Sequence, residues 1–167
     1  MTQEVQRNYL EISSIQDLKE VVAPNGDYSL NLLEPISFQL NKFFYKNIGK
    51  KHKWIDRLVW TEEQWIDYVS NKNVKTYVFK FKDDLAGFFE LISHGEKKEV
   101  EIAYFGLLEE FQNKKLGSYL LSEAIKKSFK SSNNRVWLHT CSLDHKNALN
   151  NYISRGMRIF KTETIII

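Results

Sequence analysis

The chain has 167 residues, of which 43% are hydrophobic and 14% aromatic, values that suit one globular domain with a buried core and exclude a disordered chain. Its 24 basic and 21 acidic residues give a net charge of +3 and are spread along the sequence, so it has no basic arm typical of nucleic-acid binding. No apolar run approaches the length needed to cross a bilayer, no signal segment stands out, and Cys141 alone cannot form an internal disulfide. We therefore expect a single cytoplasmic domain over residues 1–167, with neither nucleic acid nor a membrane as partner.

The first part of the sequence predicts a short strand and then helices. Tyr9 to Ile12 has the pattern of a first strand, and residues 30–70 have the pattern of helices joined by the basic, aromatic segment KNIGKKHKWIDRLVW. Thr61 and Gln64 have the spacing of a capping box, which predicts a helix beginning at this point.

Three strands should follow as an antiparallel meander. The segments VKTYVFKF, LAGFFELI and VEIAYFGLL are separated by turn residues at 82–84 and around Gly95. The third segment is uniformly apolar from Ile102 to Leu108, which predicts that it lies at the centre of the sheet.

The remaining sequence predicts a strand, loop, helix and neighbouring parallel strand. The segment FQNKKLGSYLL opens an amphipathic helix, and the strand-like RVWLHTCS follows that helix. A second helix, roughly residues 146–155, should begin with Asp144 as its N-cap and end at Gly156, and RIFKTETIII should supply one or two final strands. The expected fold class is α+β, with a mixed sheet that is antiparallel at first and parallel at its centre.

Two of these segments resemble motifs of one enzyme superfamily. The run EIAYFGLLEEFQNKKLGSYLL is similar to the strand, pyrophosphate loop and helix of the Gcn5-related N-acetyltransferases, with Lys115 at a position where the family pattern has glycine. The segment HTCSLDHKNALNNYISRGM resembles the next motif of the same superfamily. The resemblance implies the acyl-CoA N-acyltransferase fold, with a splayed parallel strand pair, and acetyl-CoA as cosubstrate without a metal.

The resemblance assigns the phosphates of coenzyme A to the loop before the helix. Successive backbone N–H groups that lead into a helix N-terminus form a concave anion site, to which the helix dipole adds positive potential. Lys115 fits this mechanism if its φ is negative, whereas Gly117 should be strict because a side chain there would crowd the phosphate or the adjoining strand. The loop residues expected to bind the cofactor are Gln112, Asn113, Lys114, Lys115, Leu116, Gly117 and Ser118. A plain strand-to-helix turn with solvated lysines is the alternative.

The resemblance also assigns a strand and a later helix to the rest of the cofactor. The pantetheine arm should pair with the backbone of Phe105, Gly106 and Leu107, and Gly106 would let a ligand approach closely. Asn147 and Tyr152 match the second motif and are expected to contact the cofactor. The alternative for Gly106 is a buried glycine at a strand bulge.

The family implies two catalytic residues. Glu101 matches the general base of some members and would remove a proton from the acceptor amine, whose free pKa is near ~10.4. Tyr152 matches the residue that protonates the departing thiolate. Glu101 could equally be a solvent-facing strand-end residue, Tyr152 could be a core aromatic, and Glu90 and His139 are other candidates for the base.

The acceptor and the rival functions complete the expectations. The aromatic, charged segment around Trp54, Asp56, Arg57 and Trp60, with His139, should shape a site for a small-molecule or peptide amine, and a homodimer is compatible with this function. One rival is a non-catalytic sensor of acyl-CoA. A less favoured alternative is an enzyme that depends on a metal or on a cysteine nucleophile. Its candidate residues are His139, Cys141, Asp144 and His145.

Overall fold

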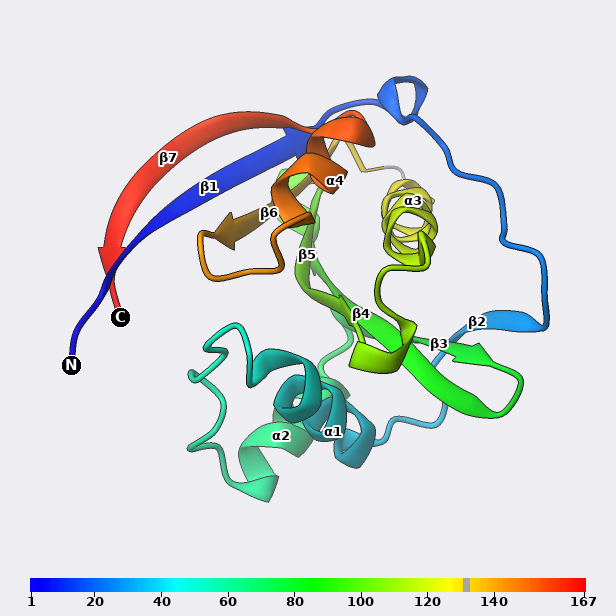
Figure 1. Ribbon diagram of the computed structural model, residues 1–167. Coiled ribbons are helices and arrows are strands. Elements are labelled where there is room, and N and C mark those ends of the chain that lie inside the picture. Colours follow the sequence, from blue (N-terminus) through cyan, green and yellow to red (C-terminus); the bar gives the residue numbers. More distant parts are fainter. Residues whose placement is uncertain (131–132) are drawn as a thin grey trace.

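The structure is a computed structural model that describes residues 1–130 and 133–167, in which seven strands form one sheet with helices on both faces (Figure 1). The strand order across the sheet is β2-β3-β4-β5-β6-β1-β7. The elements are β1 (Glu4–Ile12), β2 (Tyr28–Leu32), α1 (Phe38–Gly49), α2 (Glu62–Ser70), β3 (Val74–Phe81), β4 (Asp84–His94), β5 (Glu99–Leu107), α3 (Leu116–Phe129), β6 (Arg135–Cys141), α4 (Ala148–Ser154) and β7 (Arg158–Ile166). None of the described helices has the length and apolar character needed to span a membrane.

The predicted meander and its central strand are confirmed. β3, β4 and β5 pair antiparallel in sequence order, and β5 occupies the middle position of the sheet. β5 pairs parallel to β6, so the fold is the mixed α+β class expected from the sequence. The capping box is also present, because the Thr61 side chain accepts from the Gln64 N–H and the Gln64 side chain accepts from the Thr61 N–H.

The parallel pair separates soon after it begins. Its register joins Glu99 to Arg135, Val100 to Val136 and Glu101 to Trp137, and the pairing ends there. The rest of β5 continues beside β4, whereas the rest of β6 continues beside β1. A wedge therefore opens between β5 and β6 from Glu101 onward.

Two hydrophobic clusters hold the helices against the two faces of the sheet. The larger one packs α3 and α4 on one face, with Leu120, Leu121 and Ile125 of α3 fully buried. The smaller one packs Phe44 and Ile48 of α1 on the opposite face. α3 and α4 thus lie on one face of the sheet and α1 on the other, with α2 beside α1 (Figure 1).

The first strand differs most from its prediction. β1 begins at Glu4 instead of Tyr9, and it lies between β6 and β7, far from β2 in the sheet. The residues from Glu4 to Asn8 are mostly polar because one face of this strand is only partly covered, so they lack the apolar run that would have marked a strand. β7 forms a single strand that pairs along β1.

Two further expectations need correction. Residues 28–32 form the strand β2 beside β3, so the region expected to be helical begins with a strand. Asp144 does not cap the last helix, because its carboxylate accepts from the Cys141 N–H at 3.0 Å and from the Thr140 hydroxyl, closing the turn after β6. α4 begins later, at Ala148, with Asn147 at its N-cap position.

Candidate active site

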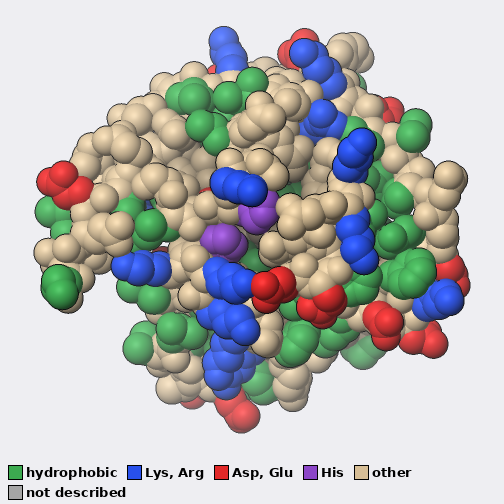
Figure 2. Space-filling model, viewed as in Figure 1, with side chains coloured by type: hydrophobic (Ala, Val, Ile, Leu, Met, Phe, Trp, Pro, Cys, Tyr) green, Lys and Arg blue, Asp and Glu red, His purple; other side chains and the backbone are tan. Residues whose placement is uncertain are grey.

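A cavity of about 1330 Å³ opens at the wedge between β5 and β6. It is lined by the second half of β5, the start of α3, the residues of α4, the end of β6 and the segment between α1 and α2. At its rim, the Nδ1 atom of His52 lies 2.9 Å from the carbonyl oxygen of Leu143, so the segment after α1 touches the segment before α4. Figure 2 shows two histidine side chains near the middle of this face, with Lys and Arg side chains above and below them. The surroundings of the cavity are therefore suited to an anionic ligand.

Beyond Glu101, the side of β5 that faces this cavity is not paired with β6. The Leu108 N–H donates to Ala86 O on β4 at 2.8 Å, and peptide groups alternate sides along a strand. The N–H and C=O groups of Phe105 and Leu107 therefore point toward the wedge, and those of Gly106 point toward β4. The Leu107 carbonyl already accepts from the Gln112 side chain at 3.1 Å. Of the three residues expected to pair with pantetheine, two turn backbone groups to the cavity.

Gly106 has a packing role that the sequence did not reveal. A Cβ built at this position would lie 2.7 Å from Ile48 Cγ2, closer than real Cβ contacts come. The missing side chain thus lets α1 approach β5. This role belongs to the core and is separate from any ligand approach.

The loop before α3 has a different backbone from the one expected for Lys115. Lys115 lies at φ 61° and Asn113 at φ 62°, both in the left-handed region that favours glycine. The condition of a negative φ at Lys115 is not met, because the chain turns into α3 through this residue, which occupies the N-cap position. Glycine, which the family pattern has at this position, would adopt this backbone conformation without strain. Lys115 still provides a backbone N–H at the start of the helix.

Gly117 is not made necessary by its protein neighbours. A Cβ there would lie 3.8 Å from Asn151 Nδ2 and from Leu107 Cδ1, which is ordinary contact, so the adjoining strand does not exclude a side chain. Gly117 lines the cavity, and its carbonyl accepts from the Asn151 side chain at 3.2 Å. Any strict need for glycine here must come from a ligand.

The loop residues divide into those that line the cavity and those that do not. Leu116 is buried in the main core, and the Lys114 ammonium lies over the Phe111 ring, 5.7 Å from its centroid. Neither is among the residues lining the cavity. Those that line it are Gln112, Asn113, Lys115, Gly117 and Ser118.

α4 places Tyr152 in the wall of the cavity. Its side chain is buried, it packs against the Phe105 ring at a centroid distance of 6.4 Å, and it lines the cavity. Burial raises the pKa of the Tyr152 hydroxyl well above its usual value, and the nearby Asp144 charge acts in the same direction. Tyr152 therefore stays protonated at neutral pH and can donate a proton. Asn147, at the N-cap position of α4, also lines the cavity.

Glu101 lies where the wedge begins. It is the last residue of β5 that pairs with β6, it lines the cavity, and its side chain is 18% exposed. One carboxylate oxygen, Oε1, lies 3.3 Å from His94 Nε2. His139 of β6 also lines the cavity, and burial, followed by the Arg7 charge, lowers the pKa of its imidazole.

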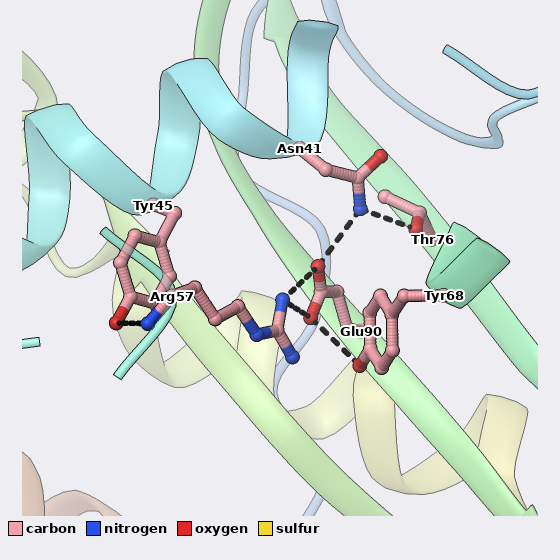
Figure 3. Close-up of polar contacts among 6 residues, drawn as sticks. All are labelled: Asn41, Tyr45, Arg57, Tyr68, Thr76 and Glu90. Carbon is pink, nitrogen blue, oxygen red and sulfur yellow. Dashed lines mark hydrogen bonds and ion pairs between the residues drawn. The ribbon is translucent and has the colours of Figure 1, made fainter. Parts of the chain in front are cut away.

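Glu90 is excluded as a base because it is fully buried and bonded to other residues (Figure 3). Arg57 Nη1 donates to both of its oxygens, at 3.1 Å to Oε1 and 2.9 Å to Oε2. Asn41 donates to Oε1 at 2.8 Å and the Tyr68 hydroxyl donates to Oε2 at 3.1 Å. The Asn41 side chain also donates to the Thr76 hydroxyl at 2.8 Å. This network fixes the segment that carries Arg57 to the sheet.

The same network builds the wall of the predicted acceptor region. The Arg57 guanidinium lies 4.1 Å from the Tyr68 ring centroid and 4.3 Å from that of Tyr104. The predicted acceptor residues Trp54, Asp56, Arg57, Trp60 and His139 all line the cavity. Sequence reasoning missed Tyr68 and Tyr104 as part of this wall. The available signal was Glu90, since an acid within an apolar strand needs a buried cation as partner.

The rival reading of the segment after β6 finds little support in the geometry. The Asp144 carboxylate is bonded within its own turn, and burial raises the pKa of the Cys141 thiol, which disfavours the nucleophilic thiolate. Within residues 1–130 and 133–167, no group of three or more His, Cys, Asp or Glu side chains is arranged to hold a metal ion.

A comparison of the sequence with known protein families identifies one family. A sequence model described as the acetyltransferase (GNAT) family matches residues 38–157. A comparison with curated proteins found no match. An acetyltransferase of Bacillus subtilis, solved in complex with CoA, has a TM-score of 0.59 and 22% identity, with 80% of this chain and 78% of that chain covered.

Other solved structures share the fold at low sequence identity. A GCN5-related N-acetyltransferase from Sphaerobacter thermophilus has a TM-score of 0.72 and 14% identity, and the match covers 97% of this chain but 50% of that one. A conserved Staphylococcus epidermidis protein of unknown function has a TM-score of 0.66 and 17% identity, with 99% of this chain and 62% of that chain covered. An aminoglycoside acetyltransferase from an uncultured soil sample, solved with trehalose, has a TM-score of 0.63 and 11% identity over 77% of this chain and 87% of that one. The chain thus spans between half and two thirds of the first two proteins.

Proposed function

Because the chain belongs to the acetyltransferase (GNAT) family, we propose that it transfers an acetyl group from acetyl-CoA to a primary amine of a small molecule or peptide. The observation that carries the proposal is the wedge between β5 and β6. It opens onto a single cavity shared by the start of α3, Glu101 and Tyr152. The residues that we assign to cofactor binding, to the general base and to the proton donor therefore line the same cavity.

The cofactor would bind along one side of the cavity. The N–H groups of residues 112–118, at the start of α3, suit the pyrophosphate, and the helix dipole adds positive potential. The pantetheine arm would extend beside β5 and pair with the wedge-facing backbone groups of Phe105 and with the Leu107 N–H, since the Leu107 carbonyl accepts from Gln112. The thioester would then lie close to Tyr152, which packs against Phe105.

The chemistry would be direct attack in a ternary complex. Glu101 takes a proton from the ammonium form of the acceptor, directly or through one water, and the freed lone pair attacks the thioester carbon. Negative charge that develops on the carbonyl oxygen is stabilised by an N–H of β5. The C–S bond then breaks as the Tyr152 hydroxyl gives its proton to the departing sulfur. The second proton of the attacking nitrogen passes through water to the Tyr152 oxygen, which yields the neutral amide and restores the phenol.

The acceptor would enter between the Arg57 wall and β6. Trp54, Trp60 and His139 offer aromatic surface there, and Asp56 offers a charge for a second amine or a hydroxyl group. This supports a polar amine as acceptor, without selecting one compound. A cytoplasmic location and assembly as a homodimer remain predictions.

Calorimetry and a thiol-release assay test the proposal together. Wild-type chain should bind acetyl-CoA, and a panel of amines should include at least one that releases coenzyme A and yields an acetylated product by mass spectrometry. Gly117→Glu should abolish binding by placing charge against the phosphates. Gly95→Glu is the matched control, because Gly95 lies in open space and the added charge is the same. Binding without turnover of any amine would instead indicate the acyl-CoA sensor, and equal binding by both variants would refute the loop assignment.

A further inference from the structure

Three neighbouring strands bring His94, Glu101 and Trp137 to one face of the sheet. Glu101 of β5 lies directly opposite Ile92 of β4 and directly opposite Trp137 of β6. His94 is two residues beyond Ile92 on β4, so its side chain projects on the same face as Ile92. His94 and Trp137 therefore flank Glu101 at the point where the wedge begins.

The His94 side chain contacts the other two. His94 Nε2 lies 3.3 Å from Glu101 Oε1, and the His94 ring stacks on Trp137 with a centroid distance of 6.2 Å and an interplanar angle of 23°. The imidazole is thus held at its face by the indole and at its edge by the carboxylate. A carboxylate on a glutamate side chain otherwise has broad freedom about its last torsion angle.

The two members of the pair face different surroundings. Glu101 lines the cavity and is 18% exposed, whereas His94 is 40% exposed and is not among the residues that line the cavity. His94 therefore contacts the carboxylate from outside the cavity. With Oε1 occupied from that side, Oε2 is the oxygen left for a ligand.

The other charged groups on this face have partners of their own. Glu99, directly opposite His94, forms an ion pair with Arg135 at 3.3 Å, and Arg135 also binds Glu11 at 2.6 Å. The ring of His139, farther along β6, lies against the Tyr9 ring at a centroid distance of 5.5 Å and a tilt of 52°. His94 is thus the side chain that the geometry assigns to Glu101.

We propose that His94 is the positioning residue of the general base: by donating from Nε2 to Glu101 Oε1 it holds the other carboxylate oxygen toward the acceptor amine. This inference rests on the proposed acetyl transfer. His94 does not touch the substrate or the cofactor, and it acts only through Glu101. Its loss should therefore slow proton removal and leave cofactor binding unchanged.

The experiment compares two substitutions of His94 in the full chain, with acetyl-CoA and an amine that the wild type acetylates. His94→Ala removes the donor and should lower kcat about 10-fold, because misplaced catalytic groups lose rate steeply. His94→Gln keeps an N–H donor at a similar reach and should stay within about 2-fold of wild type. Added imidazole should restore part of the His94→Ala rate, since the position is open to solvent. Glu96→Ala, in the adjacent exposed turn, is the control and should leave kcat unchanged.

Further measurements separate positioning from a general loss of structure. The dissociation constant for acetyl-CoA should stay within about 2-fold in all variants, and the His94→Ala effect should disappear in a Glu101→Gln background, because residues that act as a unit are not additive. A His94→Ala rate within 2-fold of wild type would overturn the proposal. So would an equal loss in His94→Gln and His94→Ala, or an equal loss with and without Glu101. A wild type that acetylates no amine would refute the proposed function itself, which is a different result.

Discussion

Arg57→Met should destabilise the protein strongly, because it removes the cation that faces a fully buried carboxylate. Glu90 is 0% exposed and accepts four hydrogen bonds, two of which come from Arg57. Methionine fills a similar volume between the aromatic rings but offers neither charge nor donor. The variant would leave Glu90 with only Asn41 and Tyr68 as donors.

The expected magnitude follows from that count. Removing one partner of a buried ion pair typically costs about 3–5 kcal/mol, because the remaining charge is neither solvated nor paired. Stacking of the guanidinium on Tyr68 and Tyr104 adds to the loss, although methionine recovers part of this contact. A domain of this size has a free energy of unfolding of about 5–15 kcal/mol, so the loss is a large fraction of the total. The double variant Arg57→Met/Glu90→Gln should recover most of it, since glutamine is neutral and still accepts from Asn41.

Urea unfolding followed by tryptophan fluorescence measures these differences, and Trp60 and Trp65 lie beside the guanidinium as reporters. Lys51→Met is the control, because its ion pair with Glu109 is largely exposed and should matter far less. If Arg57→Met lowered the free energy of unfolding by less than about 1 kcal/mol, the buried ion pair would contribute no more than a surface ion pair, and the prediction would be wrong. Strict additivity of the two single substitutions would do the same, because it would mean that Arg57 and Glu90 do not stabilise one another.

Three further outcomes follow from the site. Gly106→Ala should lower the free energy of unfolding, measured with urea, by about 1–3 kcal/mol, because the new Cβ meets Ile48 Cγ2 at 2.7 Å. Adding Ile48→Leu, which removes that methyl group, should restore part of the loss. An unchanged free energy of unfolding in Gly106→Ala would contradict the packing role. Lys115→Gly should raise the free energy of unfolding by up to about 1 kcal/mol, because glycine adopts the backbone angle of φ 61° without strain. Calorimetry at moderate salt should show that most of the acetyl-CoA affinity is kept. A less stable variant would show that the lysine side chain makes a needed contact. Tyr152→Phe should lower kcat while acetyl-CoA affinity stays nearly constant, because the ring packing against Phe105 is kept. An unchanged kcat would show that Tyr152 is not the proton donor.

The central strands and the crossover could be predicted because their signals are local. Alternation, turn residues and the capping box at Thr61 depend on neighbours in sequence, and each reappears in the structure. The position of β1 could not be predicted in this way, since its partners β6 and β7 come from the other end of the chain and its own residues are mostly polar.

Some features of the candidate site could likewise be predicted from the sequence, and others could not. Glu101, Tyr152 and most of the loop before α3 line one cavity, and their roles there stay predictions. The backbone angle of Lys115 could not be derived from its side chain, because a single residue tolerates the left-handed region when the surrounding turn requires it. Glu90 was considered as a base because an acid in an apolar strand is unusual, but its partner Arg57 lies 33 residues away in sequence and only the fold brings them together.

The pairing of β1 with β6 and β7 also sets an order in which the molecule can assemble. β3, β4 and β5 join through short turns and can form by local contacts, which are the fastest to close. β1 must wait for partners at the opposite end of the chain, as the hydrogen bond from the Tyr9 hydroxyl to Glu163, 154 residues later, illustrates. β6 makes only a short parallel pairing with β5 and depends on β1 for its remaining edge. The wall of the cavity that β6 provides should therefore be among the last parts to become ordered during folding, after the opposite wall along β5 has formed.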